Sequence, residues 1–503
     1  MLEELPLVLD RTAADPLSVQ VAAGLRAAAN SGVLRAADRL PSSRALARQL
    51  GVSRTVVAAA YDQLHAEGWL IGKQGSGTYL TTAPAAPPVR TLPVAGPDED
   101  AELLDLFPGA PCVEALDQAA WRRAWRAAGD NSAVVRRDRA GEPDYRDAVV
   151  EHLLRHRGLR AGSDTMVLST AGTSSAVGEF AHAVLRPGDV VAMEDPGYQR
   201  AMGAFLAAGI TVRPVPCDAD GLRVDLIPDG VHAVYCTPAH QFPLGARMPA
   251  ARRVELVEFA RRAGVPIVED DYDGELRYDT APLPLLAAMA PDVVIHLGTT
   301  SKILSPALGV GWLVAAPGIV QAVLAYRERT GSGPSPAGQH VFTELARHGD
   351  LARHLRRLRR TLPPRRELLV SELRRRGLPV LGDDAGSHVV VPLPSAAAED
   401  QAVAEGRARG IALDGLARHH LATQQNPYPR VPQSATQSPP PALGRHTFGI
   451  TLGYAALSLA DLARAVPIAA DCLARVAAST HRRTPGVRSP THGWSSPNRR
   501  RRA

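Results

Sequence analysis

The sequence predicts two domains of different fold class: a small, mostly helical domain at the N-terminus and a large α/β domain after it. Three observations lead to this prediction. The chain has 503 residues, more than a single hydrophobic core usually organises. Helical periodicity dominates residues 10–80, whereas strand and helix patterns alternate through residues 106–475. Between them, residues 81–105 are rich in proline, alanine and acids, which is typical of a linker.

The composition is that of a globular protein outside the membrane. Hydrophobic residues make up 45% of the chain, and no apolar run is long enough to cross a bilayer. The first ten residues carry three acids and no base, unlike a secretory signal, so we expect a cytoplasmic protein. We also expect buried thiols, and no metal or disulfide framework, because the cysteines form no C-x-x-C pair: Cys112, Cys217, Cys236 and Cys472.

Much of the net charge of +6 lies at the C-terminal end. Residues 476–503 contain seven arginines and no acid, together with several serines, prolines and glycines. This composition predicts a disordered basic tail, either a simple solvated end or a segment with sequence-independent affinity for phosphates. The remainder is close to neutral, so the overall charge does not identify the partners of the folded domains.

Lysine is almost absent from the chain. Only Lys73 and Lys302 occur, against 55 arginines. A lysine amine can lose its proton and form a Schiff base with a carbonyl, whereas the guanidinium of arginine stays protonated. Lys302 is therefore a candidate Schiff-base residue, although survival of this lysine by chance is an alternative until its surroundings are considered.

Three segments with helical periodicity, separated by glycines, make up most of the first domain. Ser42 or Ser43 can cap the second helix, and Ser53 is placed to cap the third. The tight turn Gly51-Val52 between these two helices is the signature of a helix-turn-helix. The start of the third helix should then reach the major groove of DNA, with Ser53, Arg54 and Thr55.

The end of the first domain predicts a wing. Residues 69–71 and 78–80 form two short strands, and the tip between them is rich in glycine. Gly75 lets the backbone approach DNA closely, and Lys73 can meet the sugar-phosphate chain. Residues 35–54 hold five arginines against one acid, so this face of the domain is basic.

The segment SGVLRAADRLPSSRALARQLGVSRTVVAAAYDQLHAEGWLIGKQGSGTYL resembles the winged helix-turn-helix of GntR-family bacterial repressors. The resemblance implies binding to double-stranded operator DNA. It also implies contacts from Arg44, the arginine of the PSSR motif, and from Ser53, Arg54 and Thr55. For any single one of these residues, the alternative is a capped helix with a solvated side chain.

In the large domain, five predicted strands end in polar side chains. The strands cover residues 165–169, 189–193, 233–236, 265–268 and 293–297. Ligands in α/β sheets collect at such carboxyl ends. The residues that follow include a helix start with Gly172 and Thr173, then Tyr198 and Arg200, then Asp270 and Tyr272, and finally Thr299, Ser301 and Lys302.

Together these strand ends offer a phosphate cradle, an aromatic ring, an acid, a phenol and an amine. Pyridoxal phosphate needs this set, because its phosphate, pyridine nitrogen, ring oxygen and aldehyde each require one of these partners. Each group alone has a simpler interpretation, such as a capped helix or a solvated acidic turn. Their joint order along the chain favours the cofactor.

The same order resembles fold-type I aminotransferases, and specifically the MocR subgroup of GntR regulators, over residues 106–474. The motifs are EDPGYxR, TPxHQFPxG, EDDYDxE and the serine-lysine pair. The resemblance implies a homodimer, a Schiff base on Lys302, and Asp270 rather than Asp271 at the pyridine nitrogen, because alternate strand residues share a face. The other implied cofactor contacts are Tyr272 at the ring hydroxyl, Tyr198 stacked on the ring, and Gly172, Thr173, Thr299 and Ser301 at the phosphate.

Two positions depart from the family pattern. Gly309 stands where an arginine usually binds the cofactor phosphate, and Thr451 stands where an arginine usually binds a substrate carboxylate. An amino-acid effector would then be held through Arg200 or Arg445, or not at all. Residues 422–445 are rich in proline and glutamine and predict an inserted loop.

Three functions follow from these residues. The first is a transcription regulator that binds pyridoxal phosphate through Lys302 and senses an amine, an amino acid or the cofactor itself. The second is an active aminotransferase with an attached DNA-binding domain, against which Thr451 counts. The third is a DNA-binding regulator whose large domain no longer binds the cofactor, which Gly309 favours.

Overall fold

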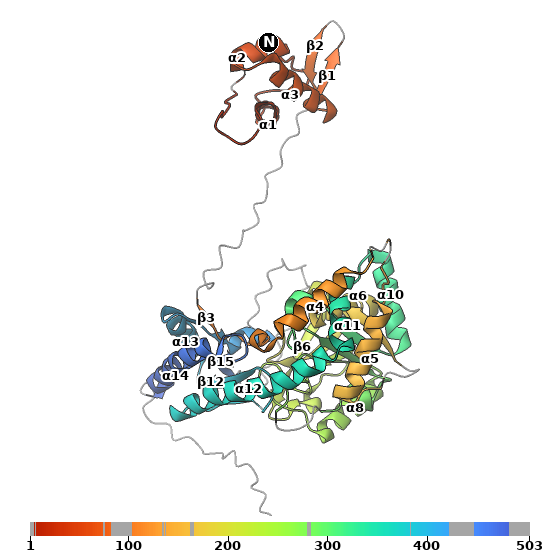
Figure 1. Cartoon of the computed structure of the whole chain (residues 1–503), viewed down its shortest axis with the longest axis vertical. Coiled ribbons are helices and arrows are strands. Elements are labelled where there is room, and N and C mark those ends of the chain that lie inside the picture. Colours follow the sequence, from red (N-terminus) through yellow and green to blue (C-terminus); the bar gives the residue numbers. More distant parts are fainter. Residues whose placement is uncertain are drawn as a thin grey trace, which may run out of the picture. The chain divides into compact units, whose positions relative to one another are not determined.

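The computed structural model describes residues 5, 7–73, 76–81, 103–132, 135, 137–160, 165–278, 283–382, 384–421 and 447–481. The chain divides into two units, Met1–Pro97 and Asp98–Ala503. The first contains three helices and a hairpin, and the second contains an eight-stranded sheet and a smaller three-stranded sheet (Figure 1). None of the described helices is long and apolar enough to cross a membrane.

The first unit contains the predicted helix-turn-helix. Its helices are α1 (Leu17–Asn30), α2 (Ser43–Leu50) and α3 (Arg54–Ala66), and strands β1 (Leu70–Lys73) and β2 (Gly77–Leu80) pair antiparallel. Ser42 caps α2 and Ser53 caps α3, each accepting a hydrogen bond from a backbone amide three residues on. Gly51 has φ +63°, a left-handed conformation that suits glycine in this turn.

The core of the first unit begins before residue 10, where the sequence analysis placed its start. Leu5 is 3% exposed, and Leu7 and Leu9 pack against the cluster built by α1, α2 and α3. This leading segment is not helical, so its apolar residues carry no helical period that would mark them as part of the domain.

The eight-stranded sheet has the order β4-β11-β10-β9-β8-β5-β6-β7. Its strands are β4 (Met166–Thr170), β5 (Val190–Asp195), β6 (Thr211–Asp218), β7 (Gly221–Leu222), β8 (Ala233–Cys236), β9 (Ile267–Asp271), β10 (Val294–Thr299) and β11 (Gly311–Ala315). β5, β6, β8, β9 and β10 run parallel, and β4 shares their direction because β11 pairs antiparallel with both β10 and β4. The five predicted strands are confirmed, and their carboxyl ends meet at one edge.

Helices bury both faces of this sheet, as parallel strands require. One face packs against α6 (Thr173–Val184), α7 (Gln199–Ala207) and α10 (Pro317–Thr330). The other packs against α5 (Pro143–Arg157), α8 (Ala250–Ala263), α11 (Pro336–Arg347) and α12 (Asp350–Arg375). Successive residues of a strand alternate between the two faces. Val167 packs on the face covered by α5, α8, α11 and α12, and Leu168 packs on the face covered by α6, α7 and α10.

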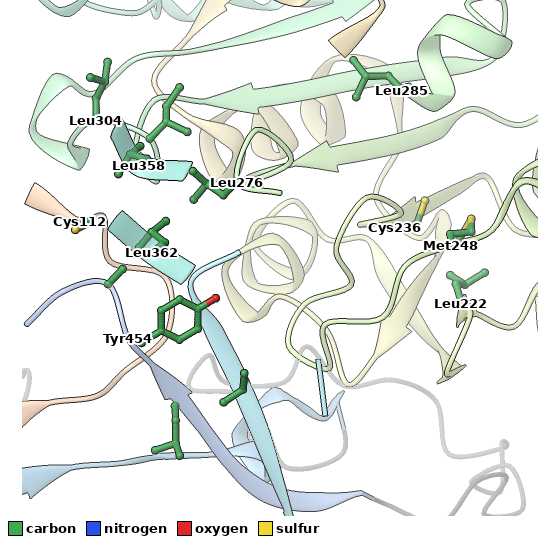
Figure 2. Packing of buried hydrophobic residues seen from close by; sticks show 14 of the residues in the cluster. Cys112, Leu222, Cys236, Met248, Leu276, Leu285, Leu304, Leu358, Leu362 and Tyr454 are labelled. Carbon is green, nitrogen blue, oxygen red and sulfur yellow. The ribbon is translucent and has the colours of Figure 1, made fainter. Parts of the chain in front are cut away.

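A smaller sheet lies in the C-terminal part of this unit. β12 (His388–Leu393), β15 (Phe448–Gly453) and β14 (Asp414–Gly415) pair antiparallel, and β3 (Leu104–Asp105) pairs with β13 (Ile411–Ala412). Helices α13 (Ala396–Ala408) and α14 (Leu459–His481) contact each other, and α12 contacts α14. Leu358 and Leu362 of α12 belong to the same buried cluster as Cys112 and Tyr454 (Figure 2).

The large domain extends beyond its predicted limits of 106 and 475. β3 begins at Leu104, and α14 continues to His481 with Val476 fully buried, so residues 476–481 belong to a helix and not to the tail. The arginines that suggested a tail begin at Arg482 and lie outside the described residues. Residues 82–102 of the linker and the predicted loop at 422–445 also lie outside them.

All four cysteines are free thiols. Cys217 is partly exposed, contrary to expectation, because it lies on β6 near the edge of the sheet.

Gly298 in β10 offers a test of this packing. A Cβ at this position would lie 2.2 Å from the buried Trp312 indole, so Gly298→Ala should reduce the free energy of unfolding by about 1–3 kcal/mol. Gly203→Ala, on the exposed side of α7 with open space around it, should instead raise it by about 0.5–1 kcal/mol. Urea unfolding followed by circular dichroism measures both, and equal effects would contradict the described packing.

Candidate functional site

Lys302 lies at the carboxyl edge of the sheet, three residues after β10 ends. Its Nζ donates a hydrogen bond to the carbonyl oxygen of Gly109, which follows β3. Burial lowers the pKa of Lys302, and the charge of Arg200 lowers it further, while the charges of Asp273 and Asp270 raise it. A lysine with a lowered pKa is more easily deprotonated and is a better nucleophile. Sequence analysis did not find Gly109, because a backbone contact leaves no side-chain motif.

Asp270 is a buried acid at the end of β9, and it is 2% exposed. Its Oδ2 accepts a hydrogen bond of 2.6 Å from the hydroxyl of Tyr235 on β8. Burial raises the pKa of Asp270 to about 7, although hydrogen bonding by the side chains of Tyr235 and Thr173 opposes this rise. Within the described part of the chain, Oδ1 has no hydrogen-bond partner. Oδ1 is therefore the oxygen of Asp270 that remains available to a donor other than Tyr235.

The two acids on either side of Asp270 are committed to other partners. Asp271 accepts two hydrogen bonds of 2.7 Å from the buried guanidinium of Arg157. Glu269 accepts hydrogen bonds from the backbone amides of Leu286 and Ala287 at the start of α9 (Leu286–Met289). The acidic turn is thus buried rather than solvated, and of these three acids Asp270 is the one with an oxygen left over.

Tyr272, the residue after β9, contacts a buried histidine. Its hydroxyl lies 2.9 Å from Nδ1 of His240, and the same nitrogen lies 3.0 Å from Oδ2 of Asp273. His240 is the histidine of the TPxHQFPxG motif, and the ring centroid of His388 lies 5.1 Å away. One ring nitrogen or carboxylate oxygen from each of His240, Asp273 and His388 lies within 4.8 Å of the others. No role was predicted from the sequence for these three residues, although His240 and Asp273 belong to the quoted motifs.

The helix start after β4 and the turn after β10 come together. Gly172 has φ +116° and precedes the first turn of α6, whose amides begin at Thr173. A Cβ on Gly172 would lie 3.7 Å from Oγ1 of Thr299, which donates a 3.0 Å hydrogen bond to Oγ of Ser301. Backbone amides at a helix N-terminus together with two hydroxyls form a suitable anion site.

Tyr198 and Arg200 follow β5. The Tyr198 ring is partly buried, its hydroxyl lies 3.1 Å from Oγ of Ser174, and its edge contacts Phe242 with ring centroids 5.7 Å apart. Arg200 is exposed on the first turn of α7. Its charge lowers the pKa of Lys302. Burial raises the pKa of Tyr198, and the charge of Arg200 opposes this rise. Arg200 therefore acts on the amine, and Tyr198 lies at the same edge, although their roles toward a ligand stay predictions.

The two departures from the family pattern have different surroundings. Gly309 ends a short 3-10 turn (Pro306–Leu308) with φ +56°, and a Cβ there would meet none of the described residues within 4 Å. Thr451 is fully buried in β15, opposite Val390 and Asp414, and no hydrogen-bond partner for its Oγ1 is seen in the part of the chain that the structure describes. Arg445, the second candidate for binding an effector, lies outside that part.

The candidate DNA-contacting residues lie on the surface of the first unit. Arg44 in α2 and Arg54 and Thr55 in α3 are exposed, whereas the Ser53 hydroxyl is engaged with Thr55 and the cap of α3. Lys73 lies in β1 with its Nζ 5.1 Å from the Tyr79 ring centroid, so it belongs to a strand rather than to the predicted tip. Gly75 lies outside the described residues.

Two family models match the chain. "Bacterial regulatory proteins, gntR family" covers residues 17–80, and "Aminotransferase class I and II" covers residues 104–453. The chain is 33% identical to the pyridoxine biosynthesis transcriptional regulator PdxR of Corynebacterium glutamicum over 377 residues, covering 74% of this chain and 82% of PdxR. It is 31% identical to the "Probable rhizopine catabolism regulatory protein MocR" of Rhizobium meliloti over 450 residues, covering 83% and 90%.

The chain belongs to the MocR subgroup of GntR-family transcription regulators. The fold of its large domain is that of aminotransferases. This MocR-type regulator is similar to kynurenine aminotransferase of Pyrococcus horikoshii, with a TM-score of 0.65 and 23% identity, covering 75% of this chain and 91% of that one. It is also similar to a multiple substrate aminotransferase of Thermococcus profundus, with a TM-score of 0.66, 21% identity and coverage of 78% and 97%.

Asp270 should make this MocR-type regulator less stable as the pH rises. Its folded pKa of about 7 exceeds the unfolded value of about 4, so the folded state binds more protons between these values, and that stabilisation is lost as the pH approaches 7. In protein without cofactor, Asp270→Asn should therefore raise the melting temperature by a few degrees at pH 8 and much less at pH 5.

The matched control is Asp271→Asn. It leaves the buried Arg157 guanidinium without its carboxylate, so it should lower the free energy of unfolding by about 3–5 kcal/mol at pH 8. Scanning calorimetry of both variants at the two pH values provides the measurement. Destabilisation by Asp270→Asn at pH 8 would contradict the description of Asp270 as a buried acid whose charged form is disfavoured in the folded state.

Proposed function

We propose that this MocR-type regulator binds pyridoxal phosphate through Lys302 and uses the occupied site to sense an amine, an amino acid or the cofactor itself. The first unit would bind double-stranded operator DNA in the cytoplasm, as part of a homodimer that reads two half-sites. One observation supports the proposal: a buried acid, whose Oδ1 has no hydrogen-bond partner among the described residues, lies at the same sheet edge as the partly buried amine, and its charge acts on that amine.

The residues at this edge fit the cofactor. Oδ1 of Asp270, which has no hydrogen-bond partner among the described residues, would accept a hydrogen bond from the protonated pyridine nitrogen. The α6 N-terminus with Gly172 and Thr173, and the hydroxyls of Thr299 and Ser301, would bind the phosphate. Tyr272 would donate to the ring hydroxyl and Tyr198 would stack on the ring.

Bound pyridoxal phosphate would supply an aldehyde that condenses with an amine and a ring that withdraws electrons from it. The chain contributes the rest. Lys302 provides a partly buried amine of lowered pKa. An effector amine would compete with this lysine for the aldehyde of the cofactor. Such an effector alters DNA binding only if it binds two arrangements of the protein with different affinity.

Gly309 supports a second candidate function, in which the large domain no longer binds the cofactor. This position lacks the arginine that binds phosphate in related sequences, and a Cβ placed there would meet none of the described residues within 4 Å. Such a protein would still bind DNA through its first unit. The two candidates differ in a single measurable property, which is binding of pyridoxal phosphate.

We expect purified protein mixed with pyridoxal phosphate to show a visible absorption band that Lys302→Ala abolishes, because the chain has no other lysine in the large domain. Lys73→Ala, which removes the only other lysine, is the matched control and should leave the band unchanged. A wild-type protein without the band would favour the second candidate function. Release of keto acid on addition of amino acids would instead identify an active aminotransferase.

DNA binding should depend on the exposed arginines of the helix-turn-helix. Arg44→Ala combined with Arg54→Ala should weaken binding to the promoter region of the protein's own gene and reduce the salt slope by about one for each phosphate that is no longer neutralised. Arg122→Ala, an exposed arginine of α4 (Gln118–Gly129) in the large domain, serves as the control. Fluorescence anisotropy at several salt concentrations measures the affinities, and unchanged affinity in the double variant would contradict the proposed role of these arginines.

A further inference from the structure

A buried pair that the proposed function does not use lies behind Tyr272. Nδ1 of His240 lies 3.0 Å from Oδ2 of Asp273 and 2.9 Å from the hydroxyl of Tyr272, so one ring nitrogen contacts both groups. His240 and Asp273 are each 2% exposed. The ring is also held in place, because a Cβ on Gly386 would lie 2.3 Å from its Cε1.

The position of the proton on this nitrogen follows from the chemistry of its two neighbours. The Asp273 carboxylate can only accept hydrogen bonds, so Nδ1 of His240 must carry the proton and donate it. A protonated ring nitrogen has no lone pair with which to accept a proton from Tyr272. The Tyr272 oxygen therefore acts as an acceptor in this contact, and its own hydroxyl proton stays available.

Asp273 and the Tyr272 hydroxyl lie on the same nitrogen of His240, so this carboxylate is the candidate acceptor for the hydroxyl once the ring is removed. Among the charged groups facing Tyr272, its charge has the largest effect in raising the pKa of the tyrosine, after burial itself. The other acids that act on Tyr272 are Asp270, Glu194 and Asp271, while Lys302 faces Asp273 from the end of β10. The His240 ring contacts both Asp273 and the tyrosine.

We propose that His240 is a positioning residue, which by donating its Nδ1 proton to Asp273 reserves the hydroxyl proton of Tyr272 for the ligand bound at Lys302. This inference rests on the proposed function, because it concerns the protonation of pyridoxal phosphate once it is attached to Lys302. A hydroxyl that donates to the ring oxygen withdraws electron density from the neighbouring nitrogen and lowers its affinity for a proton. His240 would thus set the pH at which the bound cofactor changes its charge.

The test is a pH titration of the visible absorption band of the full-length protein loaded with pyridoxal phosphate. His240→Leu removes the ring donor, lets Tyr272 donate to Asp273, and should raise the pKa of the band by about one unit, a tenfold change. His240→Asn retains an N–H near the position of Nδ1 and should restore most of the wild-type value. Asp273→Asn lets the ring accept the proton of Tyr272 but also removes a charge that raises the pKa of Lys302, so it should shift the pKa of the band upward by less than His240→Leu does.

A double-mutant cycle separates this role from a structural one. In the Tyr272→Phe background, which has no hydroxyl, His240→Leu should cause no further change in the pKa of the band. His388→Leu is the matched control: this ring is equally buried, lies 5.1 Å away, and bonds to the backbone oxygen of Pro243. It should shift the pKa far less than His240→Leu, and any shift should persist in the Tyr272→Phe background.

The outcomes are distinguishable. A wild-type protein that binds no pyridoxal phosphate removes the proposed function, and this inference with it. A protein that binds the cofactor, with a band whose pKa is the same in wild type, His240→Leu and Asp273→Asn, overturns the inference alone. Additive effects of His240→Leu and Tyr272→Phe would also overturn it, because the histidine would then act independently of the tyrosine. If His240→Leu fails to fold, the Asp273→Asn and His240→Asn variants still provide the comparison.

Discussion

The common direction of five strands is the constraint on which the site depends. β4, β5, β8, β9 and β10 all point the same way, so segments far apart in sequence end at one edge of the sheet. Helices cover both faces with apolar side chains, so polar side chains gather at the carboxyl edge of the sheet instead. A change of direction in a single strand would carry its terminal residues to the opposite edge.

The acids at the end of β9 show how burial assigns different tasks to similar side chains. Asp271 is neutralised by the Arg157 guanidinium, and Glu269 accepts two amides at a helix start. Asp270 retains one oxygen without a partner among the described residues and has a pKa raised to about 7 by burial. A carboxylate kept in this state costs folding stability, which is common for groups retained for binding.

The sequence was sufficient for features that have a local signal. Serine caps, the glycine turn and the strand ends were predicted because each depends on neighbouring residues. Partners that come from distant segments, such as Tyr235 for Asp270 or Gly109 for Lys302, leave no local pattern and could not be predicted. The start of the first domain was placed too late because Leu5 lies outside any helix, and the tail too early because the last turns of α14 are short of acids.

The hydrogen bond between Lys302 and Gly109 joins the candidate Schiff-base amine to the segment that begins the large domain. Gly109 lies seven residues after the end of the undescribed stretch 82–102, which follows the DNA-binding unit. The amine that anchors this backbone carbonyl is the same amine that a carbonyl ligand would consume. A lysine nitrogen converted into an imine has fewer protons to donate, so covalent occupancy of the proposed site would weaken this hydrogen bond to the segment that follows the DNA-binding unit in sequence.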